Sequence, residues 1–459
     1  MHSENFEQAF GASSMNKSYL ALAVVLGGAA QQAGAAGFFE DSKATLGLRN
    51  LYFNQDNRDG AADPSKQEEW GQGFILDYKS GYTQGPVGFG VDALGLLGIR
   101  LDSGKGTHYN PTSANNSGQL FPTESNGRAV HEYGSVGLTA KVRFSKTEAR
   151  LGTFLPKLPV VTHNDGRLLP QTFEGAQLSS NEIDNLTLIG GKFERAKGRS
   201  STDSGPLSIA GANNAQTGKF SNQFYFAGGD YKVGKNLLLQ YYYGNLEDFY
   251  VQHFLGLQHD WKLPVGLLKT DLRYFNSDSD GKNASVSGRA EGYRSSGYWS
   301  AGDSERGEVD NRAWSAKFTY LLDAHELSFG VQRLSGNSDF PVLNQGDGYT
   351  AYLITDSQIN KFLRAGERTW RASYAYDFAK LGVPGLKASA VYLYGDNIDT
   401  DGSDASEWER NLRLDYVLQG GLFKGVGFSY RHATLRSDVA SQRSIDENRL
   451  YITYSLPLL

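Results

Sequence analysis

Apolar and polar residues alternate along most of the chain, in short segments that begin near residue 44 and continue to the C-terminus. In the last segment, 449–459, the even positions are Leu, Ile or Tyr, whereas the odd positions from 449 to 455 are Arg, Tyr, Thr and Ser. The same period of two recurs in 135–144, 369–378 and 411–419. Because successive side chains of a strand point to opposite faces, this period predicts β-strands with one apolar and one polar face.

A soluble β-sandwich also alternates, so the period alone does not decide the class of protein. Three further features favour a closed barrel in a membrane. The segments are about ten residues long, which is the length of a tilted membrane-crossing strand. Tyr, Trp and Phe lie on the apolar faces and near segment ends, as aromatic girdles require. Short turns such as 230–235 and 420–421 alternate with long polar connectors at 103–130, 196–217, 279–306 and 335–365.

The sequence therefore predicts an all-β fold, a transmembrane antiparallel β-barrel of about eighteen strands. No composition break marks a domain boundary, so we expect residues 36–459 to form a single barrel domain. The mean hydropathy of −0.46 fits a barrel in which half of every strand faces water. The absence of cysteine fits a large exported protein whose closed strand ladder needs no disulfide. The net charge of −5 argues against nucleic acid as a partner.

The first 35 residues carry the pattern of an export signal. Lys17 precedes the apolar stretch 19–30, and the small residues 33–35, Ala-Gly-Ala, follow as a cleavage pattern. We therefore expect residues 1–35 to be an N-terminal extension and signal peptide, with the mature chain beginning near Ala36. Met1 and Met15 are both candidates for the translation start. A buried N-terminal helix is the alternative interpretation of this segment.

The sequence offers little for catalysis or for metal binding. Its eight histidines are scattered, and none belongs to an HExxH or similarly spaced pair. Neither a GxSxG elbow nor a P-loop occurs. We expect no catalytic residue, no metal site and no cofactor, and we do not expect an enzyme. An outer-membrane barrel hydrolase is the main alternative from another class of function.

Basic residues gather on the polar face of the last predicted strands. By strand parity this face carries Arg371, Lys387, Arg413, Arg431 and Arg449, and on the first strand it carries Arg49. In a closed barrel the last strand pairs with the first, so these residues form one contiguous wall of the lumen. Two further basic residues extend the set on the fourth strand, Lys141 and Arg143.

A positive stripe in a narrow tube concentrates anions, and the guanidinium fork matches a carboxylate. The basic wall therefore predicts a path for small carboxylates. The alternative is structural, with the arginines stiffening the wall by pairing with lumen-facing carboxylates, namely Asp77, Asp92, Asp377 and Asp415.

The segment 155–172 differs from the other connectors. It holds three of the twelve prolines and too many apolar residues for a loop that lies free in water. Such hydrophobic anchors favour a loop that folds into the lumen and narrows it. We expect His163, Asp165 and Arg167 to line this constriction, with Arg167 at its narrowest point. An external loop packed on the rim is the alternative.

Several stretches resemble the OprD family of Pseudomonas-type specific porins. They occur in consistent order along the chain, at 37–42, 48–54, 141–147, 167–172, 382–386 and 448–450. The resemblance implies a barrel of about eighteen strands, monomeric or loosely associated as a homotrimer, with an inward third loop. It also implies a ladder of basic residues that guides carboxylates to the constriction. On this resemblance Arg436 joins the ladder beside Arg431, and Arg167 is the loop arginine.

Within that family the sequence is most similar to the aromatic-carboxylate subgroup, the benzoate-type (BenF-like) porins. The resemblance implies passive uptake of small carboxylates, benzoate-like aromatic acids in particular, across the bacterial outer membrane. The expected partners are the carboxylate solutes and the lipid of that membrane. Two alternatives remain: a porin of the same family that passes basic amino acids and peptides, and a purely structural or adhesive barrel.

Overall fold

The computed structural model describes residues 37–58, 65–108, 118–210, 219–344 and 348–459. The expected signal segment 1–35 and both candidate start residues lie outside these ranges. Within the described ranges, no helix is both long enough and apolar enough to cross a membrane.

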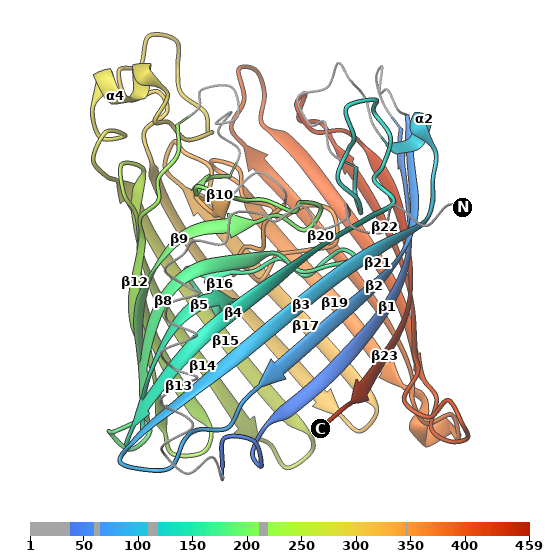
Figure 1. Ribbon diagram of the computed structural model, residues 1–459. Helices are drawn as coiled ribbons and strands as arrows, with labels where there is room; N and C mark the ends of the chain where they lie inside the picture. Colours follow the sequence, from blue (N-terminus) through green and yellow to red (C-terminus); the bar gives the residue numbers. More distant parts are fainter. Residues whose placement is uncertain (1–36, 59–64, 109–117, 211–218, 345–347) are drawn as a thin grey trace, which may run out of the picture.

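In the described residues, eighteen long antiparallel strands, each hydrogen-bonded to its neighbours, form a closed barrel (Figure 1). They are β1 (Lys43–Asn57), β2 (Lys66–Lys79), β3 (Val87–Ser103), β4 (Glu132–Phe144), β5 (Thr147–Phe154), β8 (Thr172–Ser180), β9 (Leu186–Lys197), β12 (Phe224–Val233), β13 (Leu237–Leu246), β14 (Tyr250–Lys262), β15 (Leu267–Ser279), β16 (Asp310–Leu322), β17 (His325–Ser335), β19 (Arg368–Asp377), β20 (Leu386–Ile398), β21 (Ala405–Val417), β22 (Gly427–Ser437) and β23 (Ile445–Pro457). The barrel closes because β23 pairs with β1, which places Arg449 opposite Phe53. The predicted all-β barrel of about eighteen strands is confirmed.

The remaining elements lie in the connectors. The short strands are β6 (Lys157–Leu158), β7 (Val161–Thr162), β10 (Ser204–Gly205), β11 (Ser208–Ile209) and β18 (Leu343–Asn344). The helical turns are α2 (Lys105–His108), α4 (Val286–Glu291) and η1 (Phe378–Leu381). β6 pairs with β7, β10 pairs with the end of β9, and β11 pairs with β18. The last pairing joins two connectors that are far apart in the sequence.

The two ends of the barrel differ in the length of their connectors (Figure 1). Long connectors such as 104–131 and 280–309 leave one end, here called the long-loop end. Tight turns such as 145–146 and 323–324 join the strands at the other end, here called the short-turn end. This asymmetry is the one expected from the spacing of the strand segments.

The alternation in the sequence corresponds to the two faces of the wall. On β23, Leu450 and Ile452 are 43% and 38% exposed, whereas Arg449 and Tyr451 are 4% and 5% exposed. An apolar face that stays exposed on a closed barrel fits lipid on the outside and a polar lumen on the inside.

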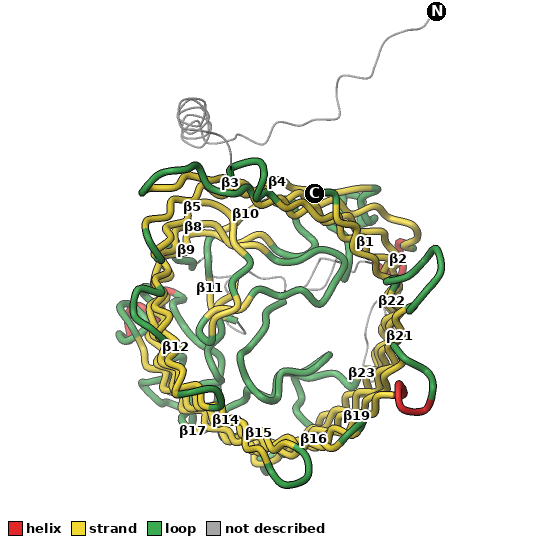
Figure 2. The backbone as a smooth tube through the Cα atoms, turned by 90° about the horizontal axis from the view of Figure 1, so that it is seen from below, coloured by secondary structure: helices red, strands yellow, loops and turns green. Residues whose placement is uncertain are grey.

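Loops lie inside the barrel wall in the view along the barrel (Figure 2), and two of the inward-folded connectors supply most of the loop residues of the lumen cavity described below. They are the first inward loop (155–171) and the second inward loop (336–344 and 348–367). Leu168 of the first packs against Phe53 of β1 in one apolar cluster. Leu353 of the second packs with Phe254 of β14 in another. The inward-folded constriction loop is thus confirmed, whereas the second inward loop was grouped with the polar external connectors, and that interpretation is wrong.

Candidate functional site

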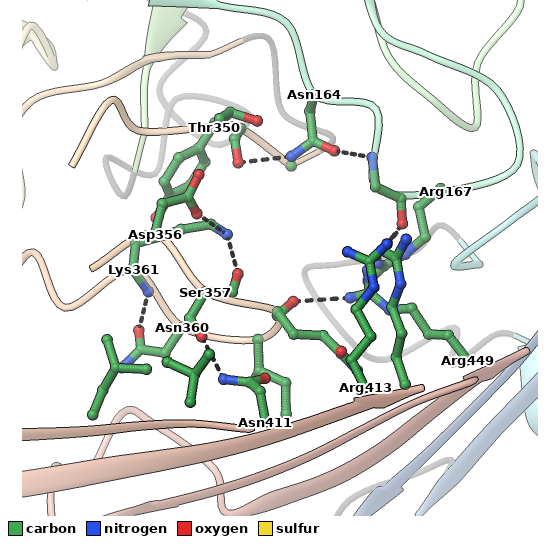
Figure 3. A pocket seen from close by; sticks show the side chains of 18 of the residues that line it. Asn164, Arg167, Thr350, Asp356, Ser357, Asn360, Lys361, Asn411, Arg413 and Arg449 are labelled. Carbon is green, nitrogen blue, oxygen red and sulfur yellow. Dashed lines mark hydrogen bonds and ion pairs between the residues drawn. The ribbon is translucent and has the colours of Figure 1, made fainter. Parts of the chain in front are cut away.

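The first inward loop is fastened to the seam between the last and the first strand. Gly166 O accepts hydrogen bonds from Arg449 Nη1 at 3.1 Å and from Tyr451 Oη at 3.2 Å. Arg49 Nη1 donates to Arg167 O at 2.9 Å. Because Arg49 lies on β1 whereas Arg449 and Tyr451 lie on β23, the loop is held where the barrel closes. Figure 3 shows Arg167 and Arg449 on the same side of the lumen cavity.

Two glycines of β2 leave room for this loop. A Cβ atom on Gly73 would lie 2.9 Å from Leu168 O. A Cβ atom on Gly71 would lie 2.7 Å from Leu168 Cδ2 and 2.7 Å from Phe121 Cζ. These separations are shorter than van der Waals contact, so glycine is what permits the loop to approach the strand this closely.

Two of the residues expected at the constriction face different surroundings. Asp165 is exposed in the lumen, and its Oδ1 pairs with Arg49 Nη1 at 2.7 Å. His163 is buried, and its Nδ1 lies 2.8 Å from Pro156 O. Burial lowers the pKa of His163, which favours the neutral imidazole. Asp165 can therefore meet a solute, whereas His163 supports the loop from within.

Arg167 lines the lumen cavity, but its side chain packs against the wall. Its guanidinium stacks over the Phe53 ring at 4.6 Å, and its Nη2 donates to Gln119 Oε1 at 2.9 Å. Burial, together with the neighbouring Arg449, lowers the pKa of Arg167 to about 9. The side chain therefore remains charged at neutral pH, yet only 11% of it is exposed.

Three arginines of the last strands stand side by side on the lumen face. Arg413 lies opposite Arg431, and Arg431 lies opposite Arg449. Like charges in direct cross-strand positions repel one another. Arg413 Nε pairs with Asp415 Oδ2 at 2.6 Å, and Arg449 Nη2 pairs with Glu447 Oε1 at 2.6 Å. Two of the three charges are therefore compensated within the wall.

Arg431 and Arg371 carry the uncompensated charge. Arg431 stacks over the Tyr451 ring at 4.5 Å, and its Nε donates to Ser429 Oγ at 3.2 Å. Arg371 Nη1 donates to Ser373 Oγ at 3.0 Å. Among the residues that the structure describes, neither arginine has a carboxylate oxygen within 4.0 Å. Their charge is thus available to a solute.

Three further residues of the expected ladder lie at the short-turn end of the lumen. Lys141 Nζ pairs with the buried Asp92 at 2.6 Å. Arg143 is exposed near the end of β4, and Lys387 Nζ lies 3.5 Å from Glu326 Oε2. Lys141 and Arg413 are thus both paired with lumen-facing carboxylates, as the structural alternative predicts.

Arg436 does not lie on the lumen wall. On β22 the lumen face carries Ala433 and Leu435, which are fully buried. Arg436 lies on the opposite face and pairs with Asp446 at 3.0 Å. Because side chains alternate along a strand, a residue five positions from the lumen-facing Arg431 points outward. The resemblance-based inclusion of Arg436 in the lumen ladder is therefore wrong.

The two inward loops and strands β19 to β23 surround a cavity of about 620 Å³ (Figure 3). Its wall side includes Arg371, Val391, Asn411, Arg413 and Arg431, and its loop side includes Ser357, Gln358, Ile359, Asn360 and Lys361. The loop side is held to the wall because Glu409 Oε2 accepts from Asn360 N at 2.7 Å. In addition, Asn411 Nδ2 donates to Ser357 Oγ at 2.7 Å.

The loop side of this cavity was missed by the sequence interpretation, as was Arg199, which also lines it. A usable signal was present, because the second inward loop contains the apolar runs 340–343 and 351–354. The same reasoning that identified 155–172 as inward applies to them. Arg199 carries no such signal, since its contact with Asn164 at 3.1 Å joins two separate connectors.

The cavity combines three kinds of lining. Uncompensated guanidinium groups provide positive charge, and Asn411 and Ser357 provide neutral polar groups. Val391 and Ile359 add an apolar surface beside the arginines. Such a lining can bind the charged group of an anion and at the same time contact an apolar part of the same molecule.

Comparison with known proteins identifies relatives over nearly the whole chain. The family model described as outer membrane porin, OprD family, matches residues 36–458. A porin-like protein, GalP, from Pseudomonas putida is 37% identical over 93% of this chain and 95% of its own length.

Several solved structures also resemble this chain in sequence and in fold. OccK8 (OprE) of Pseudomonas aeruginosa is 58% identical, covers 92% of this chain and 100% of its own, and superposes with a TM-score of 0.84. A BenF-like porin from Pseudomonas fluorescens is 36% identical with a TM-score of 0.81, at 92% and 100% coverage. OpdK of Pseudomonas aeruginosa, solved with vanillate, is 34% identical with a TM-score of 0.80 at the same coverage.

Proposed function

Because the chain belongs to the OprD family of outer membrane porins, we propose that its lumen passes small carboxylates and favours benzoate-like aromatic acids. The protein is located in the bacterial outer membrane, and its family and barrel fold point to a channel rather than an enzyme. No energy coupling is needed, since an open barrel lets solutes diffuse down their gradient.

The observation that carries this proposal is the pair of uncompensated arginines in the lumen cavity. Arg371 and Arg431 both line the cavity, on either side of the paired Arg413. In a narrow lumen with low-dielectric walls such charges concentrate anions. The guanidinium fork is matched to a carboxylate, whereas a cationic amino acid side chain would be repelled.

Aromatic acids are supported by the apolar surface beside these arginines. Val391 lies on β20, the strand next to the β19 strand that carries Arg371, and Ile359 lines the cavity from the second inward loop. A ring can rest on this surface while its carboxylate meets a guanidinium. The relative OpdK was solved with vanillate, which is an aromatic carboxylate.

We propose the following path through the barrel. The solute passes the first inward loop, where Asp165 and Arg167 narrow the lumen and His163 supports the loop. It then moves along the basic residues of the closure wall, namely Arg49, Arg449, Arg431, Arg413 and Arg371. It leaves at the short-turn end, past Lys387, Lys141 and Arg143. Spaced charges of this kind let an anion step onward without being trapped.

We also propose that residues 1–35 form an export signal that is removed, leaving 36–459 as one barrel domain. The start of the family match at residue 36 supports this boundary. Each barrel encloses its own path, so a monomer is sufficient for transport and a loose homotrimer would multiply it.

The test is conductance and solute competition in planar lipid bilayers with the double variant Arg371→Gln, Arg431→Gln. We expect the half-saturating benzoate concentration to rise at least about tenfold, since charge-assisted hydrogen bonds to a carboxylate are lost. The control is Arg312→Gln, which removes an outward-facing arginine of β16 paired with Asp310 at 2.5 Å. Benzoate that binds the double variant as it binds the control would refute the proposal, as would preferential passage of free arginine.

A further inference from the structure

The outer wall of the barrel carries a second cavity, of about 610 Å³, which shares no lining residue with the lumen cavity. Its lining is Asn54, Asp56, Arg58, Trp408, Arg410, His432, Thr434, Arg436, Asp446 and Asn448. These residues come from β1, β21, β22 and β23 and from the start of the connector after β1. None of the proposed transport residues lies among them.

Strand parity places this cavity on the outside. Between its residues stand Phe53, Glu409, Ala433 and Glu447, which face inward and are at most 1% exposed. Because side chains alternate along a strand, their neighbours in the sequence point away from the lumen. The cavity therefore opens toward the surroundings of the barrel.

Its height on the wall follows from the strand register. Asp56, Asp446, Thr434 and Arg410 are successive cross-strand partners in one row. Two positions nearer the short-turn end, the next outward row is Asn54, Asn448, His432 and Leu412. The row after that is Tyr52, Leu450, Tyr430 and Leu414, where the apolar belt begins. The cavity thus sits at the long-loop edge of the belt, where the headgroups of the outer leaflet lie.

The charge of this surface is positive. Asp446 binds two arginines at once, Arg436 at 3.0 Å and Arg58 at 2.6 Å. Asp56 contacts Arg58 at 3.1 Å. Arg410 is exposed and, among the residues that the structure describes, has no carboxylate oxygen within 4.0 Å. Three arginines therefore face two carboxylates, and one guanidinium is left for an anion.

Neutral donors surround this free guanidinium. Trp408 stacks with Tyr392 at a ring distance of 6.0 Å and presents a flat aromatic surface. Asn54, Asn448 and Thr434 contribute amide and hydroxyl groups. Arginine with amide and hydroxyl donors suits phosphate, and an aromatic face beside amides suits a sugar ring.

We propose that this outer-wall cavity binds the phosphorylated sugar headgroup of a glycolipid in the outer leaflet. Arg410 contacts the phosphate, Arg436, which Asp446 also binds, adds positive charge beside it, and Trp408 supports the sugar. The site is a lipid contact and is independent of the carboxylate path, so either proposal can fail without the other.

The experiment measures binding of lipid A, a phosphorylated glucosamine disaccharide lipid, to the full barrel in detergent by native mass spectrometry. We expect Arg410→Gln to weaken binding several-fold and Arg410→Gln with Arg436→Gln to weaken it about tenfold or more. Arg312→Gln is the matched control, because that arginine also faces outward near the long-loop end but lies on β16. Conductance equal to wild type in the double variant establishes that the barrel has folded.

Three competitors distinguish the sources of the anion. Dephosphorylated lipid A, phosphatidylglycerol and inorganic phosphate should each bind more weakly than lipid A. If dephosphorylated lipid A bound as tightly as lipid A, the cavity would not recognise the phosphate, and the proposal would be overturned. Equal binding of phosphatidylglycerol or of inorganic phosphate would overturn the glycolipid assignment. Unchanged lipid binding with an altered oligomeric state in Arg410→Gln would identify a contact between copies of the chain instead.

Discussion

Arg449 of the last strand donates a hydrogen bond from Nη1 to the carbonyl oxygen of Gly166 at 3.1 Å, although the two residues are 283 positions apart in the sequence. The same guanidinium donates from Nη2 to Gln358 O at 2.8 Å in the second inward loop. It is also paired with the buried Glu447 at 2.6 Å. One buried side chain thus connects both inward loops to the wall.

Replacing Arg449 with leucine should therefore loosen both loops and destabilise the barrel. Removing one partner of a buried ion pair leaves Glu447 without its main countercharge, which costs about 3–5 kcal/mol. We expect a lower thermal unfolding midpoint in detergent and larger current fluctuations in bilayers. Arg449→Lys keeps the charge but loses the fork, and its loss should be smaller. A leucine variant with the unfolding midpoint and the current fluctuations of wild type would contradict this role.

Neutralising Asp165 should strengthen anion selectivity. Asp165 is exposed and compensates Arg49 at 2.7 Å, so Asp165→Asn frees a guanidinium at the constriction. An exposed ion pair contributes at most about 1 kcal/mol, so the unfolding midpoint should change little. The reversal potential under a salt gradient measures the effect, and it should move toward that of an anion-selective pore. An unchanged reversal potential would show that the charge of Arg49 does not reach the solute.

Adding a methyl group under the first inward loop should displace it. In Gly73→Ala the new Cβ would lie 2.9 Å from Leu168 O, which is a backbone atom and cannot rotate away. Overpacking of this kind costs about 1–3 kcal/mol. The control is Gly47→Ala on β1, where the nearest atom is Ile75 Cβ at 3.5 Å. Thermal unfolding and conductance should change in the first variant only, and equal behaviour of the two would contradict the tight fit.

The second inward loop should become less stable as pH rises. Glu367, just before β19, is 1% exposed, and its burial together with the nearby Glu407 raises its pKa well above the ordinary value. Between about pH 4.3, the unfolded value, and that raised pKa the folded chain binds more protons than the unfolded chain. Stability is therefore fully present below this window and falls as pH increases through it.

Hydrogen–deuterium exchange of residues 348–367, corrected for the intrinsic pH dependence, measures this effect. Protection should decrease from pH 5 upward in the wild type. In Glu367→Gln, where the side chain cannot ionise, the decrease should be smaller. A variant with the same pH profile as wild type would assign the titration to other groups, of which Asp339 is the nearest candidate, since burial raises its pKa too.

The sequence alone determined the architecture of the wall. A period of two is a local property, because each residue's face follows from its neighbours' positions, so the strand faces, the lumen arginines from Arg371 to Arg449, and Arg49 could be assigned directly. The closure of the barrel then brought Arg49 and Arg449 to one seam, since a closed ladder must pair its ends. The proline-rich and apolar composition of 155–172 was sufficient to predict an inward loop.

Only the tertiary structure decided which charges remain free and what surrounds them. Arg413 and Arg431 look equivalent in the sequence, but Asp415 compensates the first and no described carboxylate lies within 4.0 Å of the second. Strand parity from Arg431 already places Arg436 on the outer face, but its pairing with Asp446 of the next strand is visible only in the structure. The second inward loop completes the cavity through contacts such as that of Asn360 with Glu409. Contacts of this kind join residues far apart in the chain, and a local pattern carries no information about them.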